Sequence, residues 1–296
     1  MKLINSSFEI LEQEPGLQGI YKQIELAGRT CYKSLDKITK DSAKDFVDRM
    51  INSKHYAMLE HGTVYLKVPN EIVNEGFRFE TDWDTLCFNP YTRYSTDCYY
   101  YYYTTNYRVI IEHNLQEVLK YLCEPTEFHE KRVTVGFTTS NGIMRELTRH
   151  RSHSFAVEST RYCNYSKNKF NNEIQCIIPS WCKNMVNGNS YNWELVHDYN
   201  IRQTEGLSEA EARLIMSWCY SEAHYLMLTN KGILTAQQVR EVLPLATKCD
   251  MVMTGFVSDY QHFFDLRARG TTGAPHPDAK ALAEPLMHEF ENRKLV

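Results

Sequence analysis

The chain has 296 residues, enough for one large domain or two modest ones, and its 43% hydrophobic content excludes a disordered or fibrous protein. Its formal net charge is −4, so it lacks the overall positive field of a protein that wraps long nucleic acid. No apolar stretch approaches the about eighteen residues of a membrane span, and the N-terminus turns polar at once, so we expect neither a membrane segment nor a signal peptide.

Two helices and a strand are predicted before residue 70. Apolar residues recur at helical spacing between Pro15 and Gly28, residue types that are common at helix boundaries. A second helix is predicted from Ser42, as its N-cap, to about Ile51. Apolar and polar residues then alternate over 63–68, which predicts a strand.

The stretch 70–130 contains the tyrosine tract Tyr99–Tyr103. Aromatic residues favour strands, so we predict a half-buried sheet face here rather than a platform on which bases stack, with a hairpin turn near 104–106. Beyond it, the pattern predicts a strand over 133–137 and a helix that opens at Ser140 and runs into Arg149. A short strand over 174–178 and a loop over 183–192 follow.

The C-terminal third is predicted to be helical, with Met251–Met253 in the core. Capping boxes are expected at Ser208 with Glu211, Thr235 with Gln238, and Ser258 with Gln261. A last helix begins near Asp278, with a kink expected at Pro285. Because no repeat or linker separates these elements, we predict one α+β domain over 1–296, with a mixed or antiparallel sheet packed by helices.

Nine cysteines are present, an odd number with no Cys-x-x-Cys pair. Irregular spacing in a chain of this length is typical of reduced core cysteines, so we expect a cytoplasmic protein without structural zinc. His55, His61, His150 and His153 lack the carboxylate or cysteine spacing of a metal site, and no metal is expected.

Arginines concentrate between residues 145 and 161, although the chain is acidic overall. Arg145, Arg149, Arg151 and Arg161 alternate there with serine and threonine residues. Guanidinium groups bind phosphate in a fork geometry, so the segment predicts a nucleotide phosphate site. A solvated basic helix end is the alternative, and composition alone leaves the two nearly even.

The order of these residues is more specific. Arg149-His150-Arg151, seven residues, and then Ser159-Thr160-Arg161-Tyr162 is similar to the signature of the flavin-dependent thymidylate synthases. Further segments resemble that family in the same chain order: 28–32, 55–61, 239–244 and 263–267. The resemblance covers most of the chain outside 70–130 and 183–205, and we interpret about 70–130 as an insertion.

This resemblance implies a homotetramer that binds FAD and dUMP, with NADPH and 5,10-methylenetetrahydrofolate as co-substrates, and no nucleic acid or membrane partner. Arg267 and Ser159 would form the catalytic centre, Arg267 by stabilising charge on the uracil and Ser159 by binding the substrate rather than attacking it. The implied FAD contacts are His55, Glu60, Arg149, His150, Arg151, Ser152 and His262. The implied dUMP contacts are Glu146, Arg149, Glu158, Ser159, Thr160, Arg161, Arg267 and, from a neighbouring subunit, Arg240.

Several positions depart from the family pattern, namely Cys31, Ala57, Ala156, Val157, Phe256 and Ser258. These departures leave open an enzyme that methylates or hydroxymethylates another pyrimidine nucleotide. A non-catalytic nucleotide-binding protein is a third alternative. The loop 270–277 fits either a mobile flap over the site or a plain connector.

Overall fold

The structure, a computed structural model, describes residues 1–76, 82–196 and 205–296. Within these ranges the largest sheet has four strands in the order β2, β6, β9, β7, and every neighbouring pair is antiparallel. The expected α+β class with an antiparallel sheet is confirmed. The central strands are β6 (Arg132–Ser140) and β9 (Lys248–Phe256), and the edges are β2 (Ser7–Ile10) and β7 (Ser154–Val157).

The central strand β9 lies in a region for which the sequence predicts helices, so that prediction is wrong over 248–256. Met251 and Met253 pack into the core beneath α10 (Val257–Phe264) and α11 (Pro277–Asn292), while Val252 packs into the core on the opposite face. A strand that is buried on both faces shows no apolar–polar alternation, which is why the period-2 signal is missing.

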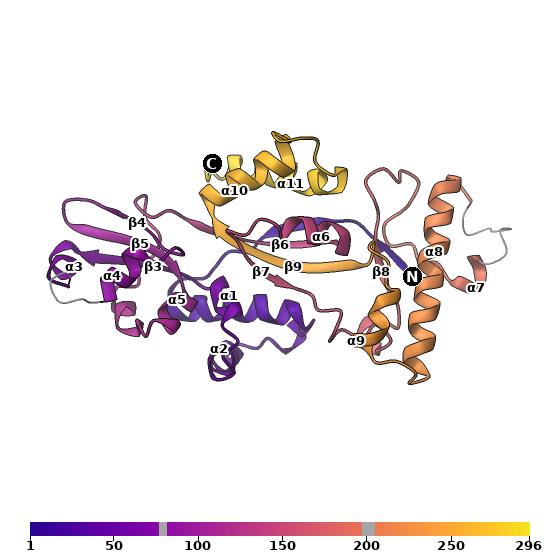
Figure 1. Cartoon of the computed structure of the whole chain (residues 1–296), viewed down its shortest axis with the longest axis horizontal. Coiled ribbons are helices and arrows are strands. Elements are labelled where there is room, and N and C mark those ends of the chain that lie inside the picture. The colour runs from indigo at the N-terminus through magenta and orange to yellow at the C-terminus, as the bar shows by residue number, and fades with distance from the viewer. Residues whose placement is uncertain (77–81, 197–204) are drawn as a thin grey trace.

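A second antiparallel sheet, with strand order β3, β5, β4, forms one end of the molecule (Figure 1). Its strands are β3 (Thr63–Pro69), β5 (Tyr100–Asn106) and β4 (Arg93–Thr96). The strand predicted over 63–68 and the strand character of the tyrosine tract are both confirmed. Tyr103 is fully buried and stacks on Trp83 at 5.9 Å between ring centroids.

The predicted hairpin turn near 104–106 is wrong. These residues continue β5 opposite β3, as β-branched threonines favour, and the Asn106 side chain then accepts the Val109 N–H to cap α5 (Tyr107–Glu112). The turn lies instead between β4 and β5, where the Asp97 carboxylate accepts the N–H groups of Tyr99 and Tyr100, both at 2.7 Å.

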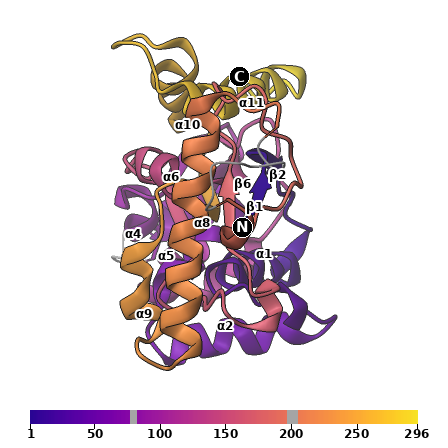
Figure 2. The ribbon, with the colours of Figure 1, turned by 90° about the vertical axis from the view of Figure 1, so that its right-hand side faces the viewer.

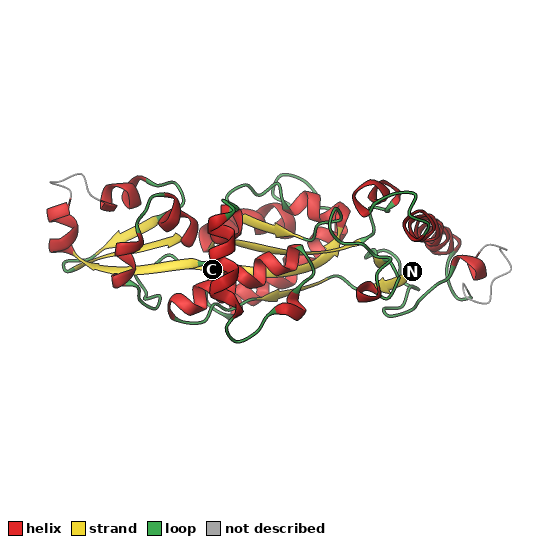
Figure 3. Ribbon diagram, turned by 90° about the horizontal axis from the view of Figure 1, so that it is seen from below, coloured by secondary structure: helices red, strands yellow, loops and turns green. Residues whose placement is uncertain are grey.

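Helices cover both faces of the large sheet (Figures 1 and 2). On one face lie α1 (Gly16–Cys31) and α2 (Ser42–Asn52), and on the other lie α10 and α11. The long helix α8 (Glu209–Asn230) stands at the end opposite the small sheet, and Figure 3 shows the two antiparallel sheets following one another along the molecule. The other elements are α3 (Asn70–Gly76), α4 (Asp82–Phe88), α6 (Asn141–Leu147), α7 (Trp193–Val196), α9 (Ala236–Val239) and the parallel pair β1 (Lys2–Ile4) and β8 (Gln175–Ile177).

One hydrophobic cluster joins α1, α2 and the small sheet to the large sheet. Ile24, Phe46 and Leu66 belong to it together with Ala156 and Val252 from β7 and β9. A single domain with an insertion at about 70–130 stays a prediction, and 77–81 lie outside the described residues. None of the described helices is both long enough and apolar enough to span a bilayer.

Two of the three predicted capping boxes are present in the structure, and the third is replaced by a contact with a distant residue. The boxes at Ser208 with Glu211 and at Thr235 with Gln238 are confirmed, but the box at Ser258 is wrong. The helix there starts after Phe256, and the Ser258 hydroxyl donates to Glu130 at 2.5 Å instead of capping. An acidic partner distant in sequence competes with the local cap, which a local pattern cannot reveal.

Candidate active site

The arginine-rich segment lies where the chain turns from one side of the large sheet to the other. Helix α6 begins with the Ser140 hydroxyl accepting the Ile143 N–H at 3.2 Å and ends at Leu147. The turn 148–153 then reverses the chain so that β7 can pair with β9. Arg149, His150 and Arg151 therefore sit on this turn, with Arg149 and Arg151 exposed and without an ion pair in the part of the chain that the structure describes.

Arg267 joins this turn to the C-terminal helices. It lies in the π-helical turn Asp265–Arg269 that extends α10. Its guanidinium donates from Nη1 to Oε2 of Glu146 at 2.8 Å and from Nη2 to the Glu146 carbonyl at 3.0 Å. Its Nε donates to Nε2 of His150 at 3.2 Å. Three residues that the sequence assigns to one site are thereby brought into direct contact.

Burial, together with this contact, holds His150 in the neutral form. Burial lowers the pKa of His150 to about 4, and the Arg267 charge and His262 lower it further in the same direction. Because Arg267 donates to Nε2, the single ring proton of the neutral imidazole is assigned to Nδ1. His262 is exposed, with its ring centroid 6.0 Å from that of His150.

A cavity of about 610 Å³ lies beside this cluster, and Met144 and Arg145, the two residues before Glu146, line it. Two segments far apart in sequence meet in it: Ser159 and Thr160 after β7, and Arg240 with Pro244 after α9. The Ser159 N–H donates to the Cys31 carbonyl at 2.9 Å, and its carbonyl accepts the N–H groups of Tyr162 and Cys163, which fixes a tight turn. Arg240 reaches the cavity from within the same chain. The other lining residues are Asn141, Val157, Glu158, Glu241, Leu243 and Leu245.

Glu158 lines the cavity, but its carboxylate is engaged by the protein. Oε1 accepts the Tyr165 hydroxyl at 3.1 Å, and Oε2 accepts the Asp250 N–H at 3.1 Å. The Lys33 ammonium lies 3.3 Å from Oε2 and also pairs with Asp250. The Lys248 ammonium pairs with Asp250 at 2.7 Å.

Lys33, Lys248 and Asp250 are absent from the sequence-based site, although Glu158, which they accompany, belongs to it. The signal that could have found these residues is Asp250, a carboxylate that stands between Cys249 and Met251 in a mainly apolar stretch, since a charge in a core strand requires a partner.

Other predicted site residues lie apart from the Arg267 cluster. Arg161 donates to Gln237 of α9 at 3.2 Å and does not belong to the cavity lining described above. His55 precedes the 3₁₀ turn Tyr56–His61, and Glu60 in that turn pairs with Arg108 at 2.6 Å. Ser152 is exposed, with Oγ 3.4 Å from Nδ1 of His153.

The imidazole of His153 is enclosed between β9 and α10. Its ring centroid lies 4.6 Å from that of Tyr260, and burial lowers the pKa of His153 to about 3. A Cβ atom on Gly255 would lie 2.3 Å from Cδ2 of this ring, so the strand approaches it as closely as only glycine permits. His153 therefore fixes the 148–153 turn, which also carries His150, against β9 and α10.

The chain is similar to known proteins in a family model and among solved structures. A family model described as thymidylate synthase complementing protein matches residues 104–293, from within β5 to the end of α11. A UMP/dUMP methylase from Streptomyces cacaoi, bound with 5-Br UMP, is 14% identical, with 99% of this chain and 92% of that chain covered at a TM-score of 0.45. A flavin-dependent thymidylate synthase from Helicobacter pylori, with FAD and dUMP, is 14% identical over 98% and 97%, at a TM-score of 0.40. No curated protein matches the sequence at a significant level. Because the family model spans well over half of the chain, this protein belongs to the thymidylate synthase complementing protein family.

Proposed function

We propose that this chain is a flavin-dependent thymidylate synthase, which converts dUMP to dTMP. The observation that carries the proposal is the meeting of Ser159, Thr160 and Arg240 in one cavity beside the contact between Arg267 and His150. A volume of about 610 Å³ suits a nucleotide. Membership of the thymidylate synthase complementing protein family supports a pyrimidine nucleotide as the ligand of this cavity.

The proposed dUMP contacts fall into two groups, those to the phosphate and those to the uracil. Arg240 would supply a cation to the dUMP phosphate, together with the hydroxyls of Ser159 and Thr160, which line the same cavity. Arg149 and Arg161, which the family resemblance also assigns to dUMP, do not line this cavity in the structure. Arg267 and Glu146 would face the uracil. Glu158, whose carboxylate already accepts two hydrogen bonds, would act by shaping the cavity wall.

The residues around His150 also fit a flavin. The neutral imidazole of His150 and the exposed His262 offer a ring-sized surface for the flavin. Arg149 and Arg151, which form no ion pair within the described residues, offer counter-charges for the pyrophosphate of FAD. His55, Glu60 and Ser152 complete the proposed FAD contacts. At Phe256 the fit is poorer, because the ring is covered by the guanidinium groups of Arg93 and Arg132.

When bound and reduced by NADPH, FAD supplies the hydride, and 5,10-methylenetetrahydrofolate supplies the carbon. Arg267 stabilises negative charge that develops on the uracil, and its bonds to Glu146 and His150 fix the guanidinium in place beforehand. Ser159 binds the substrate and does not attack it. We further propose that the protein is a cytoplasmic homotetramer.

The proposal is tested by the visible absorption spectrum of the purified protein, before and after anaerobic addition of NADPH with dUMP. Flavin absorption that bleaches on reduction, followed by dTMP formation when the folate is added, is the expected result. A protein that stays colourless after incubation with FAD would exclude the flavin mechanism.

A second candidate is methylation or hydroxymethylation of another pyrimidine nucleotide. Val157 favours it, because this apolar residue lines the cavity where the family commonly has a glutamate or glutamine. Product mass after turnover with dUMP, UMP and dCMP separates the two candidates, since a methyl and a hydroxymethyl product differ by one oxygen.

A further inference from the structure

Two segments that are far apart in sequence form one surface beside the proposed nucleotide cavity. They are 31–40, at the end of α1, and 159–170, which follows β7. The Ser159 N–H donates to the Cys31 carbonyl at 2.9 Å and so joins the two segments. Because Ser159 and Thr160 also line the cavity, the surface begins at the edge of the cavity. We call it the lysine surface, for the residues described below.

Two tyrosine rings are exposed on the lysine surface. Tyr32 and Tyr162 come from different segments, and their ring centroids lie 5.3 Å apart. Tyr32 is 38% exposed and Tyr162 is 58% exposed. The Arg161 guanidinium lies over the Tyr162 ring, 5.3 Å from its centroid. An exposed pair of aromatic rings offers a place against which a planar ring of a ligand can pack.

Positive charge is concentrated on the same surface, although the chain is acidic overall with a net charge of −4. The two segments contain six cationic residues and one acidic residue, Asp36. Lys33 is engaged with Glu158 and Asp250. The other cations are exposed, namely Lys37, Lys40, Arg161, Lys167 and Lys169. Among these five, only Lys169 has an ion-pair partner in the described parts of the chain, Asp36 at 3.9 Å.

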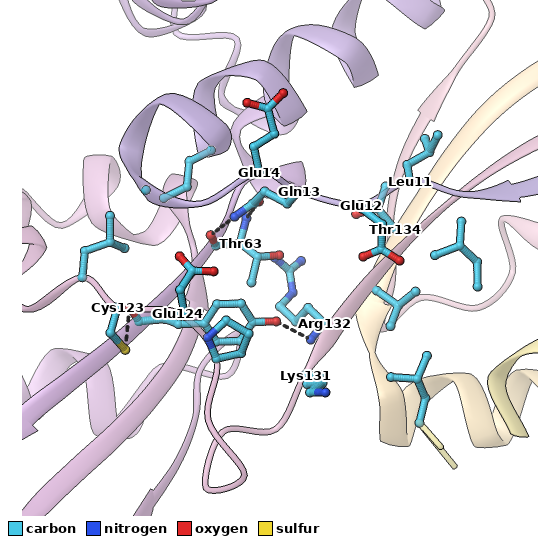
Figure 4. Close-up of a pocket in the computed structure, with 18 of the residues that line it drawn as sticks. Leu11, Glu12, Gln13, Glu14, Thr63, Cys123, Glu124, Lys131, Arg132 and Thr134 are labelled. Carbon is cyan, nitrogen blue, oxygen red and sulfur yellow. Dashed lines mark hydrogen bonds between the residues drawn. The ribbon is translucent and has the colours of Figure 1, made fainter. Parts of the chain in front are cut away.

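The cavity of about 400 Å³ at the junction of the two antiparallel sheets shows no such imbalance (Figure 4). Three carboxylates and three cations line it: Glu12, Glu14, Glu124, Lys131, Arg132 and Arg293. Opposite charges in equal number give no preference for the charge of a ligand. The lysine surface, in contrast, favours a ligand with several negative charges.

A ligand for the lysine surface therefore combines a planar ring with a flexible polyanion. The folate of the proposed reaction has this composition, because an aminobenzoyl ring links its pterin to a glutamate. Further glutamates can be joined through the γ-carboxyl group, and each adds one carboxylate. Single-stranded nucleic acid also combines rings with charge, but the acidic chain lacks the overall positive field that favours it.

We propose that the lysine surface binds the poly-γ-glutamate tail of the folate co-substrate. The aminobenzoyl ring packs against Tyr32 and Tyr162, and the carboxylates of the tail lie along Lys37, Lys40 and Lys167. This inference rests on the proposed function and adds the form of the co-substrate, because such a surface favours polyglutamates over the monoglutamate.

The test is equilibrium titration of the holoenzyme, loaded with FAD and dUMP, with pteroylmonoglutamate and with pteroylpentaglutamate. We expect the pentaglutamate to bind about tenfold more tightly at low salt, because several exposed ion pairs each contribute modestly and in the same direction. This advantage should shrink in about 0.5 M sodium chloride, since salt screens exposed charges.

The double variant Lys37→Gln with Lys167→Gln should reduce the advantage of the pentaglutamate to less than about threefold and leave monoglutamate binding unaltered. Lys280→Gln with Lys294→Gln is the matched control, since both residues are exposed at α11, on the other face of the large sheet from α1, and the control should keep the full advantage. Tyr162→Leu should weaken the two folates to the same extent, because both contain the aminobenzoyl ring.

Equal affinities of the unsubstituted holoenzyme for the two folates would overturn this inference and leave the proposed function intact, whereas a protein that cannot be loaded with FAD would overturn both. Two further outcomes would assign the surface to another partner and overturn the inference. One is displacement of the pentaglutamate by a thymidine decanucleotide that binds more tightly. The other is a change of oligomeric mass in the lysine double variant, measured by light scattering, which would indicate contact with a second copy of the chain.

Discussion

Arg267 and His150 show how a single contact sets the chemistry of two side chains. The hydrogen bond from Nε of Arg267 requires an unprotonated Nε2 on His150, and the positive charge beside the ring disfavours a second proton. Burial acts in the same direction and is the larger cause. The imidazole therefore stays neutral throughout the physiological range.

Replacing Arg267 by glutamine should raise the pKa of His150 from about 4 only part of the way toward the usual value, because burial remains when the charge is removed. Titration of the imidazole C–H resonances by NMR measures this directly. Arg269→Gln is the control, since Arg269 pairs with Asp265 at the surface and not with His150. An unchanged His150 pKa in Arg267→Gln would contradict the electrostatic coupling.

Arg240 is the residue on which the proposed phosphate site can best be tested. Arg240→Gln should weaken dUMP binding by about tenfold and leave deoxyuridine binding unaltered, because only the nucleotide carries the phosphate. Equilibrium titration of both ligands gives the two dissociation constants. Lys280→Gln, on the exposed face of α11, should alter neither. Equal losses for dUMP and deoxyuridine would show that Arg240 does not bind the phosphate.

Strand β9 organises the site at the scale of elements. Helix α6 and the 148–153 turn lie in the chain between its two paired neighbours, β6 and β7. The last residues of β9 lead directly into α10 and the π-helical turn after it, which carries Arg267. Strand β9 thus connects the segment that carries Glu146 and His150 with the segment that carries Arg267. The close approach of Gly255 to His153 is part of this arrangement.

Gly255→Ala should lower the free energy of unfolding by about 1–3 kcal/mol, because the new methyl group has no room beside the His153 ring. Urea unfolding followed by fluorescence measures the change. Gly142→Ala is a matched control near the start of α6, where the nearest atom to a new Cβ is Oγ of Ser140 at 3.6 Å. That variant should stay within about 0.5 kcal/mol of the unsubstituted chain. Equal midpoints for the two alanine variants would refute the close contact.

At the scale of the whole molecule, burial lowers the pKa of four histidines in the described residues: His61, His129, His150 and His153. For three of them the lowering is large. Burial lowers the pKa of His61 to about 3, that of His153 to about 3 and that of His150 to about 4. Each group binds a proton more readily in the unfolded chain, where a histidine titrates near about 6.5. Unfolding therefore takes up protons as the pH falls through that value.

The free energy of unfolding should accordingly fall with decreasing pH below about 6.5 and continue to fall until the folded-state pKa values are reached. At pH 5 each of the three histidines contributes a loss of up to about 2 kcal/mol. Urea midpoints between pH 8 and pH 5 test this. His288→Gln should leave the pH profile unchanged, because its side chain is 60% exposed. A flat profile would mean that the three imidazoles titrate normally in the folded protein.

The sequence by itself determined those features that depend on residues close together in the chain. Local periodicity and capping patterns predicted α1, β3, β6, α8 and the box at Ser208, and the spacing from Arg149 to Tyr162 indicated the family that the family model also matches. These signals survive because helix periodicity, end capping and a motif on one turn are set by neighbouring residues.

The tertiary structure alone decided which distant residues share an environment. It made 248–256 a central strand, engaged the Glu158 carboxylate with Tyr165 and Asp250, and brought Arg240 into the same cavity as Ser159. Each outcome depends on long-range packing. A strand that is buried on both faces lacks the apolar–polar alternation by which a strand is predicted. The partners of a hydrogen bond or a shared cavity can be far apart in sequence, and no local pattern indicates which residues they are.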